Sequence, residues 1–144
     1  TKFWNEIKLY NKKNNCRLSF TRLENISLHG TPDLLVYNAG GYFFTVELKV
    51  TKTNKVRLSP HQIAFHEKHP RASFILVKDL SSKEVKLYEG SRVRLLAACG
   101  LELEACRLGL EACCLRLASF GDLSVELDAW TLIHPRKNYL KQIS

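Results

Sequence analysis

Hydrophobic residues near the start of the chain recur at helical spacing and then change to alternation. Phe3, Ile7 and Tyr10 lie three or four residues apart, which predicts an amphipathic helix over residues 2–12. From residue 17 to residue 26 apolar and polar side chains largely alternate, as is typical of a strand with one buried face. The chain is therefore expected to begin with a helix followed by a strand.

Two apolar runs flank a turn at residues 39–41, Ala-Gly-Gly. Residues 34–38 form the shorter run, and residues 42–50 form a longer one that is rich in aromatic and β-branched side chains. Glycines suit a tight turn because they adopt backbone angles that other residues avoid. The pattern predicts two strands joined in a hairpin.

A helix start follows a basic loop. Ser59 is a favourable N-cap, Pro60 suits the first helical position, and Gln62 stands where it can close a capping box. Pro70 is expected to end this helix. The apolar run after it and the stretch beyond a polar turn predict two further strands, at residues 72–78 and 84–90.

The predicted elements follow the order α-β-β-β-α-β-β. Such an order predicts an α/β (α+β) fold in which helices pack on a mixed β-sheet. A chain of 144 residues is long enough for one core, so we expect a single domain over residues 1–144 with its centre in about residues 1–90. Residues 91–144 are expected to form a C-terminal extension.

Residues 98–118 repeat every seven residues as ACGLELE, ACRLGLE and ACCLRLA. Ala, Leu and Glu favour a helix, and a seven-residue period would present one apolar stripe to a partner. Gly100 and Gly109 weaken a helix, however, and the alternation within each repeat leaves a strand open. We expect a helix that packs on the domain or mediates self-association.

The charge of the chain adds information on partners. Lys and Arg number 22 against 14 Asp and Glu, a formal net charge of +8, which suggests a polyanionic partner and nucleic acid before membrane. No run of eighteen apolar residues and no signal peptide occurs, so a soluble protein without a membrane partner is expected. The five cysteines match neither a disulfide framework nor a zinc pattern and are expected to be free, buried thiols.

Charged residues interrupt the predicted hairpin. Alternation along residues 42–50 places Glu47 and Lys49 on the same face of the strand. If a tight turn sets Asn38 opposite Tyr42, the partner of Glu47 is Asp33, and directly opposed side chains have Cβ atoms about 4.5–5.5 Å apart. The simplest hairpin therefore brings two carboxylates and one lysine together.

Two carboxylates this close repel each other unless a cation lies between them. Hard divalent cations such as Mg²⁺ take oxygen ligands of this kind, and the backbone carbonyl of Leu48 could add another. Lys49 could orient an attacking water or stabilise negative charge, so the group suits phosphodiester hydrolysis. The alternative is a surface hairpin with a cross-strand ion pair worth only about 0.2–1 kcal/mol.

Pro32-Asp33 followed by Glu47-Leu48-Lys49 resembles the signature of the PD-(D/E)XK nuclease superfamily. The segments RLEN at residues 22–25 and KVRLSPHQIAFH at residues 55–66 resemble the VRR-NUC and Holliday-junction-resolvase-like branch, especially stand-alone phage-type nucleases. The resemblance covers roughly residues 20–90. It implies a restriction-endonuclease-like mixed sheet flanked by helices, a divalent-metal-dependent nuclease, and a place of action in the cytoplasm of a bacterial host.

The same resemblance implies roles for particular residues. Asp33 and Glu47 would be ligands of Mg²⁺ or Mn²⁺, and Lys49 would be the catalytic lysine. Glu24 would complete the acidic cluster, with Glu6 on the first helix as its rival. For each glutamate the alternative is plain surface charge.

Gln62 resembles the glutamine that follows the catalytic strand in the family and lies near the metal or the substrate phosphate. A capping box with Ser59 would explain both residues without any site role, and the two roles can coexist. Lys52, Lys55 and Arg57 follow the catalytic strand and are candidates for contacts with the DNA backbone, with a solvated loop as the alternative.

The sequence thus predicts an endonuclease that hydrolyses DNA phosphodiester bonds with the help of a divalent metal. Resolvase-like relatives imply a homodimer that selects duplex or branched DNA by its structure. A sequence-specific endonuclease of the homing or restriction type is one alternative, although only residues 91–144 are left to read base edges. A DNA-binding module that kept the fold without the chemistry is the other.

Overall fold

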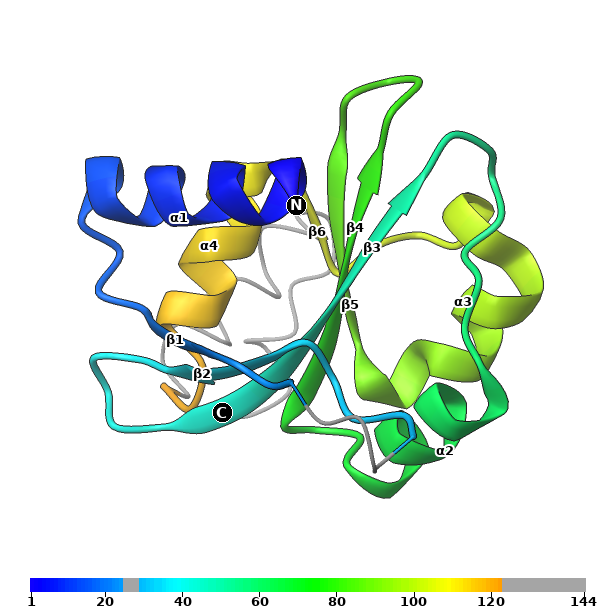
Figure 1. Ribbon diagram of the computed structural model, residues 1–144, viewed down its shortest axis with the longest axis horizontal. Helices are drawn as coiled ribbons and strands as arrows, with labels where there is room; N and C mark the ends of the chain where they lie inside the picture. Colours follow the sequence, from blue (N-terminus) through cyan, green and yellow to red (C-terminus); the bar gives the residue numbers. More distant parts are fainter. Residues whose placement is uncertain (25–28, 123–144) are drawn as a thin grey trace, which may run out of the picture.

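A six-stranded mixed sheet forms the centre of the computed structural model, which describes residues 1–24 and 29–122 (Figure 1). The strands are β1 (Ser19–Arg22), β2 (Leu34–Tyr37), β3 (Phe43–Thr51), β4 (Ser73–Asp79), β5 (Val85–Glu89) and β6 (Arg107–Leu108). They lie side by side in sequence order, and every neighbouring pair is antiparallel except β3 and β4, which are parallel.

Helices cover both faces of this sheet (Figure 1). In the described residues these are α1 (Lys2–Asn14), α2 (Pro60–Lys68), α3 (Val93–Cys99) and α4 (Leu110–Ala118), with short 3₁₀ turns η1 (Gly90–Arg92) and η2 (Gly100–Glu102). α1 and α4 lie on one face, and α2 and α3 lie on the other. The predicted α/β class, a mixed sheet flanked by helices, is confirmed. None of the helices in the described segments is long and apolar enough to cross a membrane.

Each face of the sheet has its own apolar core. Alternation along the strands sends neighbouring side chains to opposite faces, so both cores draw on the same strands. The α1/α4 side includes Phe3, Ile7, Phe44, Phe74, Cys113 and Leu117. The α2/α3 side includes Val56, Ile75, Val77, Tyr88, Val93 and Leu96.

The first helix forms where its pattern predicts. Thr1 caps it by accepting the N–H of Trp4 at 3.3 Å, and Asn15 ends it in the left-handed conformation with φ 50°. Phe3 and Ile7 are buried against the sheet. Burial of these two side chains, each worth about 1.5–3 kcal/mol, holds the helix in place.

α2 belongs to the connection between the two parallel strands β3 and β4. The predicted capping box is present, because Gln62 N–H donates to Ser59 Oγ at 3.2 Å and Ser59 N–H donates to Gln62 Oε1 at 3.0 Å. Pro60 takes the first helical position, and the helix ends at Lys68, just before Pro70. This start brings Gln62 over the sheet.

The hairpin between β2 and β3 is fixed by Asn38, which is fully buried. Its N–H donates to the Tyr42 carbonyl at 3.1 Å, and its Oδ1 accepts the Tyr42 N–H at 3.1 Å. Its side-chain amide also donates to the Phe120 carbonyl at 2.9 Å. The hairpin is therefore tied to the segment that follows α4.

The prediction of one helix over the repeat at residues 98–118 is wrong. α3 ends at Cys99, and Gly100, which follows it, adopts φ 61°. A Cβ at Gly100 would lie 2.0 Å from the backbone oxygen of Asn54, in the basic loop that follows β3. β6 then pairs with β5, and α4 begins only after Gly109, which has φ 82°. Both glycines adopt angles that other residues avoid, so they divide the repeat into a helix end, a strand and a second helix.

Two further expectations concern the termini of elements and the thiols. The strand expected within residues 17–26 is β1, and the last residues of that range lie outside the described segments, as does much of the expected C-terminal extension.

All five cysteines are free, as predicted, but only Cys113 and Cys114 are buried, and Cys99 is exposed. Burial raises the pKa of Cys113 and of Cys114 to about 12.

Candidate functional site

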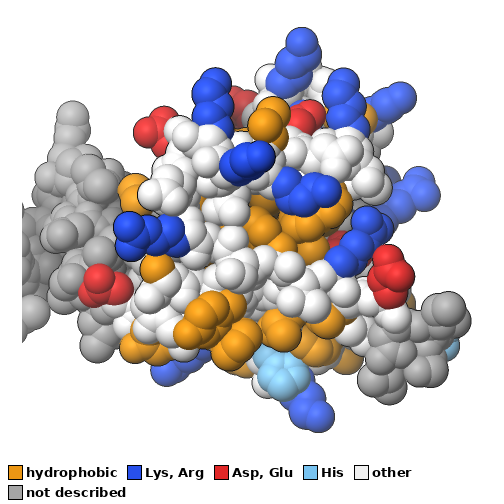
Figure 2. Space-filling view, turned by 60° about the vertical axis from the view of Figure 1, so that its left-hand side comes forward, with side chains coloured by type: hydrophobic (Ala, Val, Ile, Leu, Met, Phe, Trp, Pro, Cys, Tyr) orange, Lys and Arg blue, Asp and Glu red, His pale blue; other side chains and the backbone are white. Residues whose placement is uncertain are grey.

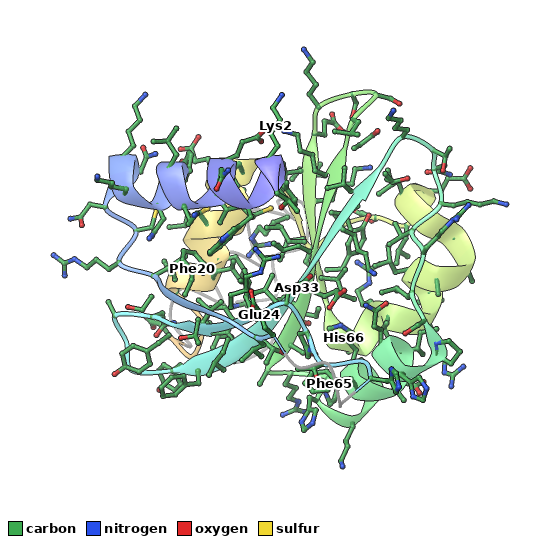
Figure 3. All side chains as sticks on the ribbon, viewed as in Figure 1. Lys2, Phe20, Glu24, Asp33, Phe65 and His66 are labelled. Carbon is green, nitrogen blue, oxygen red and sulfur yellow. The ribbon has the colours of Figure 1, made fainter. Side chains whose placement is uncertain are left out.

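The register of the hairpin places Asp33 beside Glu47. β2 and β3 pair Leu34 with Val46 and Tyr37 with Phe43. Continuing this register by one residue would set Asp33 opposite Glu47, and the charge of Asp33 does act on the Glu47 carboxylate. Figure 3 shows Asp33 where the chain enters the sheet between the two helical layers.

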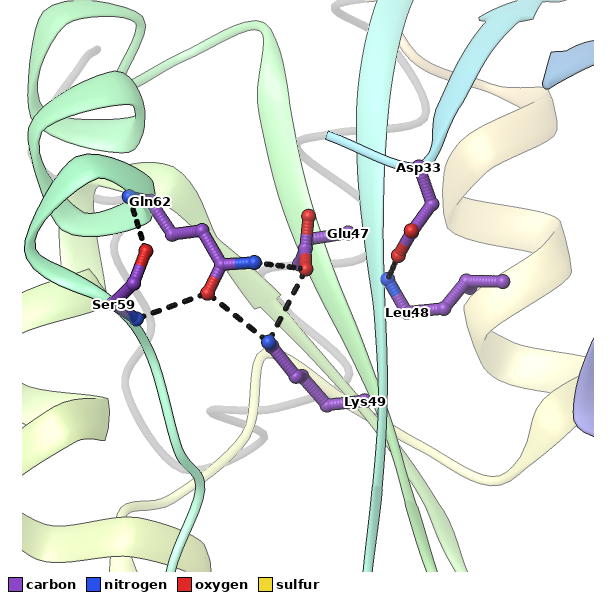
Figure 4. A network of polar contacts seen from close by, with 6 residues as sticks. All are labelled: Asp33, Glu47, Leu48, Lys49, Ser59 and Gln62. Carbon is purple, nitrogen blue, oxygen red and sulfur yellow. Dashed lines mark hydrogen bonds and ion pairs between the residues drawn. The ribbon is translucent and has the colours of Figure 1, made fainter. Parts of the chain in front are cut away.

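Asp33 is held by the backbone of β3. Its Oδ2 accepts the Leu48 N–H at 2.8 Å (Figure 4). The pairing of β2 with β3 ends at Leu34 and Val46. Beyond this pair, the Asp33 carboxylate accepts the β3 N–H that a backbone carbonyl of β2 would otherwise accept. Because the N–H and C=O of one strand residue point to the same neighbouring strand, the Leu48 carbonyl faces the side on which Asp33 lies.

Glu47 is buried, with 3% of its surface exposed, and faces α2. Its Oε1 accepts the side-chain amide of Gln62 at 2.7 Å and lies 3.3 Å from Lys49 Nζ. Burial raises the pKa of Glu47 to about 7, and the charge of Asp33 contributes to this rise, whereas Lys49 lowers it. A cation next to both carboxylates would offset the cost of ionising Glu47.

Gln62 links Lys49 to Glu47. Lys49 Nζ donates to Gln62 Oε1 at 3.1 Å, while the amide nitrogen of Gln62 binds Glu47 (Figure 4). The same Oε1 accepts the Ser59 N–H of the capping box. The capping role and the contact with the carboxylate therefore coexist in one side chain.

The donor atoms at this place fit a hard divalent cation. Two carboxylates and a backbone carbonyl are the oxygen ligands that Mg²⁺ and Mn²⁺ prefer. Within the described residues, however, no three His, Cys, Asp or Glu side chains gather closely enough to hold an ion. Asp33 and Glu47 are thus a pair, without a third acidic ligand beside them in this part of the chain.

The two candidates for the third carboxylate both have other partners. Leu23 N–H donates to the Asp33 carbonyl at 2.8 Å. This bond brings the backbone of Glu24, the next residue in the sequence, near Asp33 (Figure 3). Its side chain is 81% exposed and lies 3.9 Å from Arg22. Glu6 on α1 forms an ion pair with Lys78 on β4. The role of Glu24 as a ligand, like that of Glu6, stays a prediction.

The basic loop after β3 is folded and exposed. Lys52, Lys55 and Arg57 all lie on the surface. Thr51 Oγ1 donates within this loop to the Lys55 carbonyl at 2.8 Å, and Ser81 Oγ donates to the Lys52 carbonyl at 2.8 Å. These bonds shape the backbone and leave the three basic side chains facing solvent. A contact with DNA stays a prediction.

A small cleft beside Asp33 was not predicted from the sequence. It has a volume of about 130 Å³ and is lined by Thr1, Phe3, Trp4, Arg22, Asp33, Leu34, Leu48 and Val50. The helical spacing of the first helix indicates that Phe3 is buried, but no local pattern shows which strand Trp4 will meet. The cleft lies on the α1 side of the sheet and shares Asp33 and Leu48 with the candidate site.

No known protein-family model matches the sequence, and no curated protein matches it. Among solved structures, the chain is similar to a Holliday junction resolvase, Hjc, from the archaeal hyperthermophile Archaeoglobus fulgidus. The two are 18% identical, the match covers 63% of this chain and 76% of that one, and the TM-score is 0.46. A similarity of this degree carries no functional conclusion, so the function is argued from the site itself.

Proposed function

We propose that this protein is a divalent-metal-dependent endonuclease of the PD-(D/E)XK type that hydrolyses DNA phosphodiester bonds. The observation that carries the proposal is the set of contacts around Glu47. Asp33 accepts the N–H of Leu48, the residue after Glu47, while Gln62 and Lys49 both contact the Glu47 carboxylate. Burying a carboxylate as Glu47 is buried is costly. Carboxylates whose pKa is raised as far as that of Glu47 cluster at functional sites, where the shifted pKa serves binding or catalysis.

Asp33, Glu47 and the carbonyl of Leu48 would hold Mg²⁺ or Mn²⁺. When bound, the metal supplies a Lewis acid that stabilises negative charge on the phosphoryl group and lowers the pKa of a bound water. Asp33 is suited to this role because one of its oxygens, Oδ2, is fixed by the Leu48 N–H, which orients the carboxylate. The pair would thus present a prepared binding site.

Lys49 would act next to the reacting phosphate. Its ammonium group lies within 3.3 Å of Glu47 and is held by Gln62, so its place is defined before substrate arrives. From there it can donate to the attacking water or to a developing oxyanion. Gln62 would serve as a positioning residue for both charged side chains.

A basic surface supports DNA as the substrate. On the face shown in Figure 2, Lys and Arg side chains are spread widely and outnumber the Asp and Glu side chains that lie among them. Lys52, Lys55 and Arg57 are exposed and follow the strand that carries Glu47. Their role would be to hold phosphates and set the register of the duplex. Selection of branched DNA by a homodimer, with one site in each copy, completes the proposal.

A DNA-binding module without nuclease activity is the second candidate. Two observations support this candidate. In the described residues no third acidic side chain joins Asp33 and Glu47, and the Glu47 carboxylate already contacts Gln62 and Lys49. Such a module would bind DNA equally well with and without a divalent metal.

Cleavage of supercoiled, linear and branched DNA with Mg²⁺, with Mn²⁺ or with EDTA tests the proposal. We expect cutting that depends on the metal. Glu47→Ala and Lys49→Ala should abolish cutting but not DNA binding. Glu84→Gln, a control at an exposed position before β5, should leave both unchanged. Dependence on branching supports the resolvase-like form, and dependence on sequence supports the homing or restriction type. A preparation that cuts no form of DNA with either metal would favour the binding module.

A further inference from the structure

Two aromatic side chains are exposed side by side on the β2–β3 hairpin. Tyr37 and Phe43 are direct cross-strand partners, and their ring centroids lie 4.6 Å apart. Phe43 is 61% exposed and Tyr37 is 40% exposed. Large aromatic rings contribute most when they are buried, so an exposed pair of this kind indicates a contact surface.

The aromatic pair lies on the face of the sheet that carries the candidate site. Phe44 and Val46 point into the core beneath α1 and α4. Because side chains alternate along β3, Phe43 shares the opposite face with Glu47 and Lys49. Phe43 and Glu47 are four residues apart on one strand, which corresponds to about 13 Å.

Three kinds of chemistry therefore follow one another along β3. The aromatic pair is at its start, Glu47 and Lys49 are near its middle, and the basic loop with Lys52 follows its end (Figure 1). A nucleic-acid strand has the matching features, since it alternates phosphates with flat bases. A separation of about 13 Å corresponds to a few nucleotides.

We propose that Tyr37 and Phe43 form a stacking platform for unpaired bases of the nucleic-acid strand that the Glu47–Lys49 site cuts. The inference rests on the proposed function for the position of the cut. Bases within a duplex are stacked on their neighbours and cannot reach a flat protein surface. Unpaired bases can, and each base stacked on an aromatic ring contributes about 1–3 kcal/mol of binding. The platform would favour DNA with a single-stranded arm or an open branch next to the scissile bond.

Binding measured in EDTA, by fluorescence anisotropy, tests the platform without cleavage. The probes are a blunt duplex and the same duplex with a short single-stranded arm. We expect the wild-type protein to prefer the arm, and Tyr37→Leu/Phe43→Leu to lose about tenfold or more of that preference. Tyr37→Trp/Phe43→Trp should retain it, because tryptophan also stacks. Leucine keeps the surface apolar, so its effect separates stacking from general hydrophobic contact.

Leu108→Ala is the matched control. Leu108 is 62% exposed, much like Phe43, but lies on β6 at the opposite edge of the sheet. This variant should bind both probes as the wild type does. A 2-aminopurine base placed in the arm should be quenched by the wild-type protein and by the tryptophan pair, and not by the leucine pair. Far-UV circular dichroism and thermal unfolding confirm that each variant is folded.

Three results would overturn the platform. The first is an arm preference that survives in the leucine pair, and the second is a wild-type protein with no arm preference. The third is a dimer, measured by light scattering, that Tyr37→Ala/Phe43→Ala converts to monomers, because the surface would then join two copies of this chain. Cleavage is not read here, so a protein that prefers the arm but cuts no DNA would disprove only the proposed function.

Discussion

Asp33 Oδ2 accepts the backbone N–H of Leu48 at 2.8 Å, just beyond the last paired residues of β2 and β3. A side-chain oxygen thus continues the hydrogen-bond ladder after the strand itself has stopped. The bond sets the position of the Asp33 carboxylate from the backbone of β3, the strand that also carries Glu47. The position of the Asp33 carboxylate is therefore set by the hairpin, whereas the Glu47 carboxylate is held by Gln62 and Lys49.

Asp33→Asn should separate the charge of this residue from its hydrogen bond. Asparagine keeps a side-chain oxygen that can accept the Leu48 N–H, but it carries no charge and is a weak metal ligand. We expect nearly unchanged unfolding by urea and a loss of metal-dependent cleavage of about 100-fold or more. Asp33→Ala should lose cleavage and also about 1–2 kcal/mol of stability, because the Leu48 N–H loses its partner. Cleavage by Asp33→Asn at the wild-type rate would remove Asp33 from the ligand set.

Ser59 and Gln62 allow the two roles of the glutamine to be measured apart. Both residues take part in the capping box, but only Gln62 touches Glu47 and Lys49. Ser59→Ala should cost about 1 kcal/mol of stability and leave the cleavage rate unchanged at a temperature where the variant is folded. Gln62→Ala should lower stability similarly and reduce the cleavage rate as well. Equal cleavage rates in the two variants would limit Gln62 to helix capping.

The hairpin and the capping box could be predicted because local rules determine them. A tight turn with Asn38 opposite Tyr42 fixes every pair along β2 and β3, and alternation then determines which residues share a face. Ser59, Pro60 and Gln62 carry their helix signal within four residues. For the same reason the register of β2 and β3, from Leu34 opposite Val46 to Tyr37 opposite Phe43, followed from spacing alone.

The remaining features depend on contacts between distant segments. The repeat at residues 98–118 has helical composition, but Gly100 packs against the basic loop and Gly109 stands before α4 in a conformation with positive φ. Neither constraint is visible in a seven-residue period. The bond between Lys49 and Gln62 likewise depends on how α2 crosses the sheet, which alternation and capping rules leave open. The exposed partners Tyr37 and Phe43 were predicted to lie on strands, but their exposure depends on which face the helices leave uncovered.

The basic loop should contribute to DNA binding through charge alone. Replacing Lys52, Lys55 and Arg57 by alanine removes three exposed charges without touching a hydrophobic core. If all three contact phosphates, the slope of log K against log salt should become less steep by about 3, and affinity should fall equally for all DNA sequences. Titration of a labelled duplex at several salt concentrations measures this slope. Lys12→Ala/Lys13→Ala, at the end of α1, is the control. An unchanged slope in the loop variant would show that the three side chains stay in solvent and make no contact with phosphates.

His66 on α2 should make the protein less stable in acid. The Ser73 hydroxyl donates to the His69 carbonyl at 2.6 Å, so it accepts the N–H of His66 Nδ1 at 2.9 Å. Burial, then the charges of Lys49 and His69, lower the pKa of His66 to about 4 from an ordinary value of 6.5. The unfolded chain therefore takes up a proton first. This contribution to stability is present above pH 6.5 and is lost as the pH falls to about 4.

Glu47 should act in the opposite direction over nearly the same range. Its pKa is raised from 4.5 to about 7, so the folded protein binds a proton more tightly than the unfolded chain. In the absence of metal, stability from this group is greatest below pH 4.5 and declines as the pH rises to about 7. Each group changes stability by up to about 3 kcal/mol, and between pH 4.5 and 6.5 the two trends oppose each other.

Variants at the two positions should therefore reveal trends that the wild-type protein conceals. Glu47→Gln removes the falling trend, so stability measured by urea unfolding in EDTA should rise clearly from pH 4.5 to 6.5. His66→Asn removes the rising trend, and stability should fall from pH 4.5 to 7. Mg²⁺ should stabilise the wild-type protein more at pH 8 than at pH 5, because a bound cation favours the ionised carboxylate, and should have no such effect on Glu47→Gln. If Glu47→Gln and the wild type show the same pH profile and the same response to Mg²⁺, then Glu47 neither titrates near neutrality nor binds the metal.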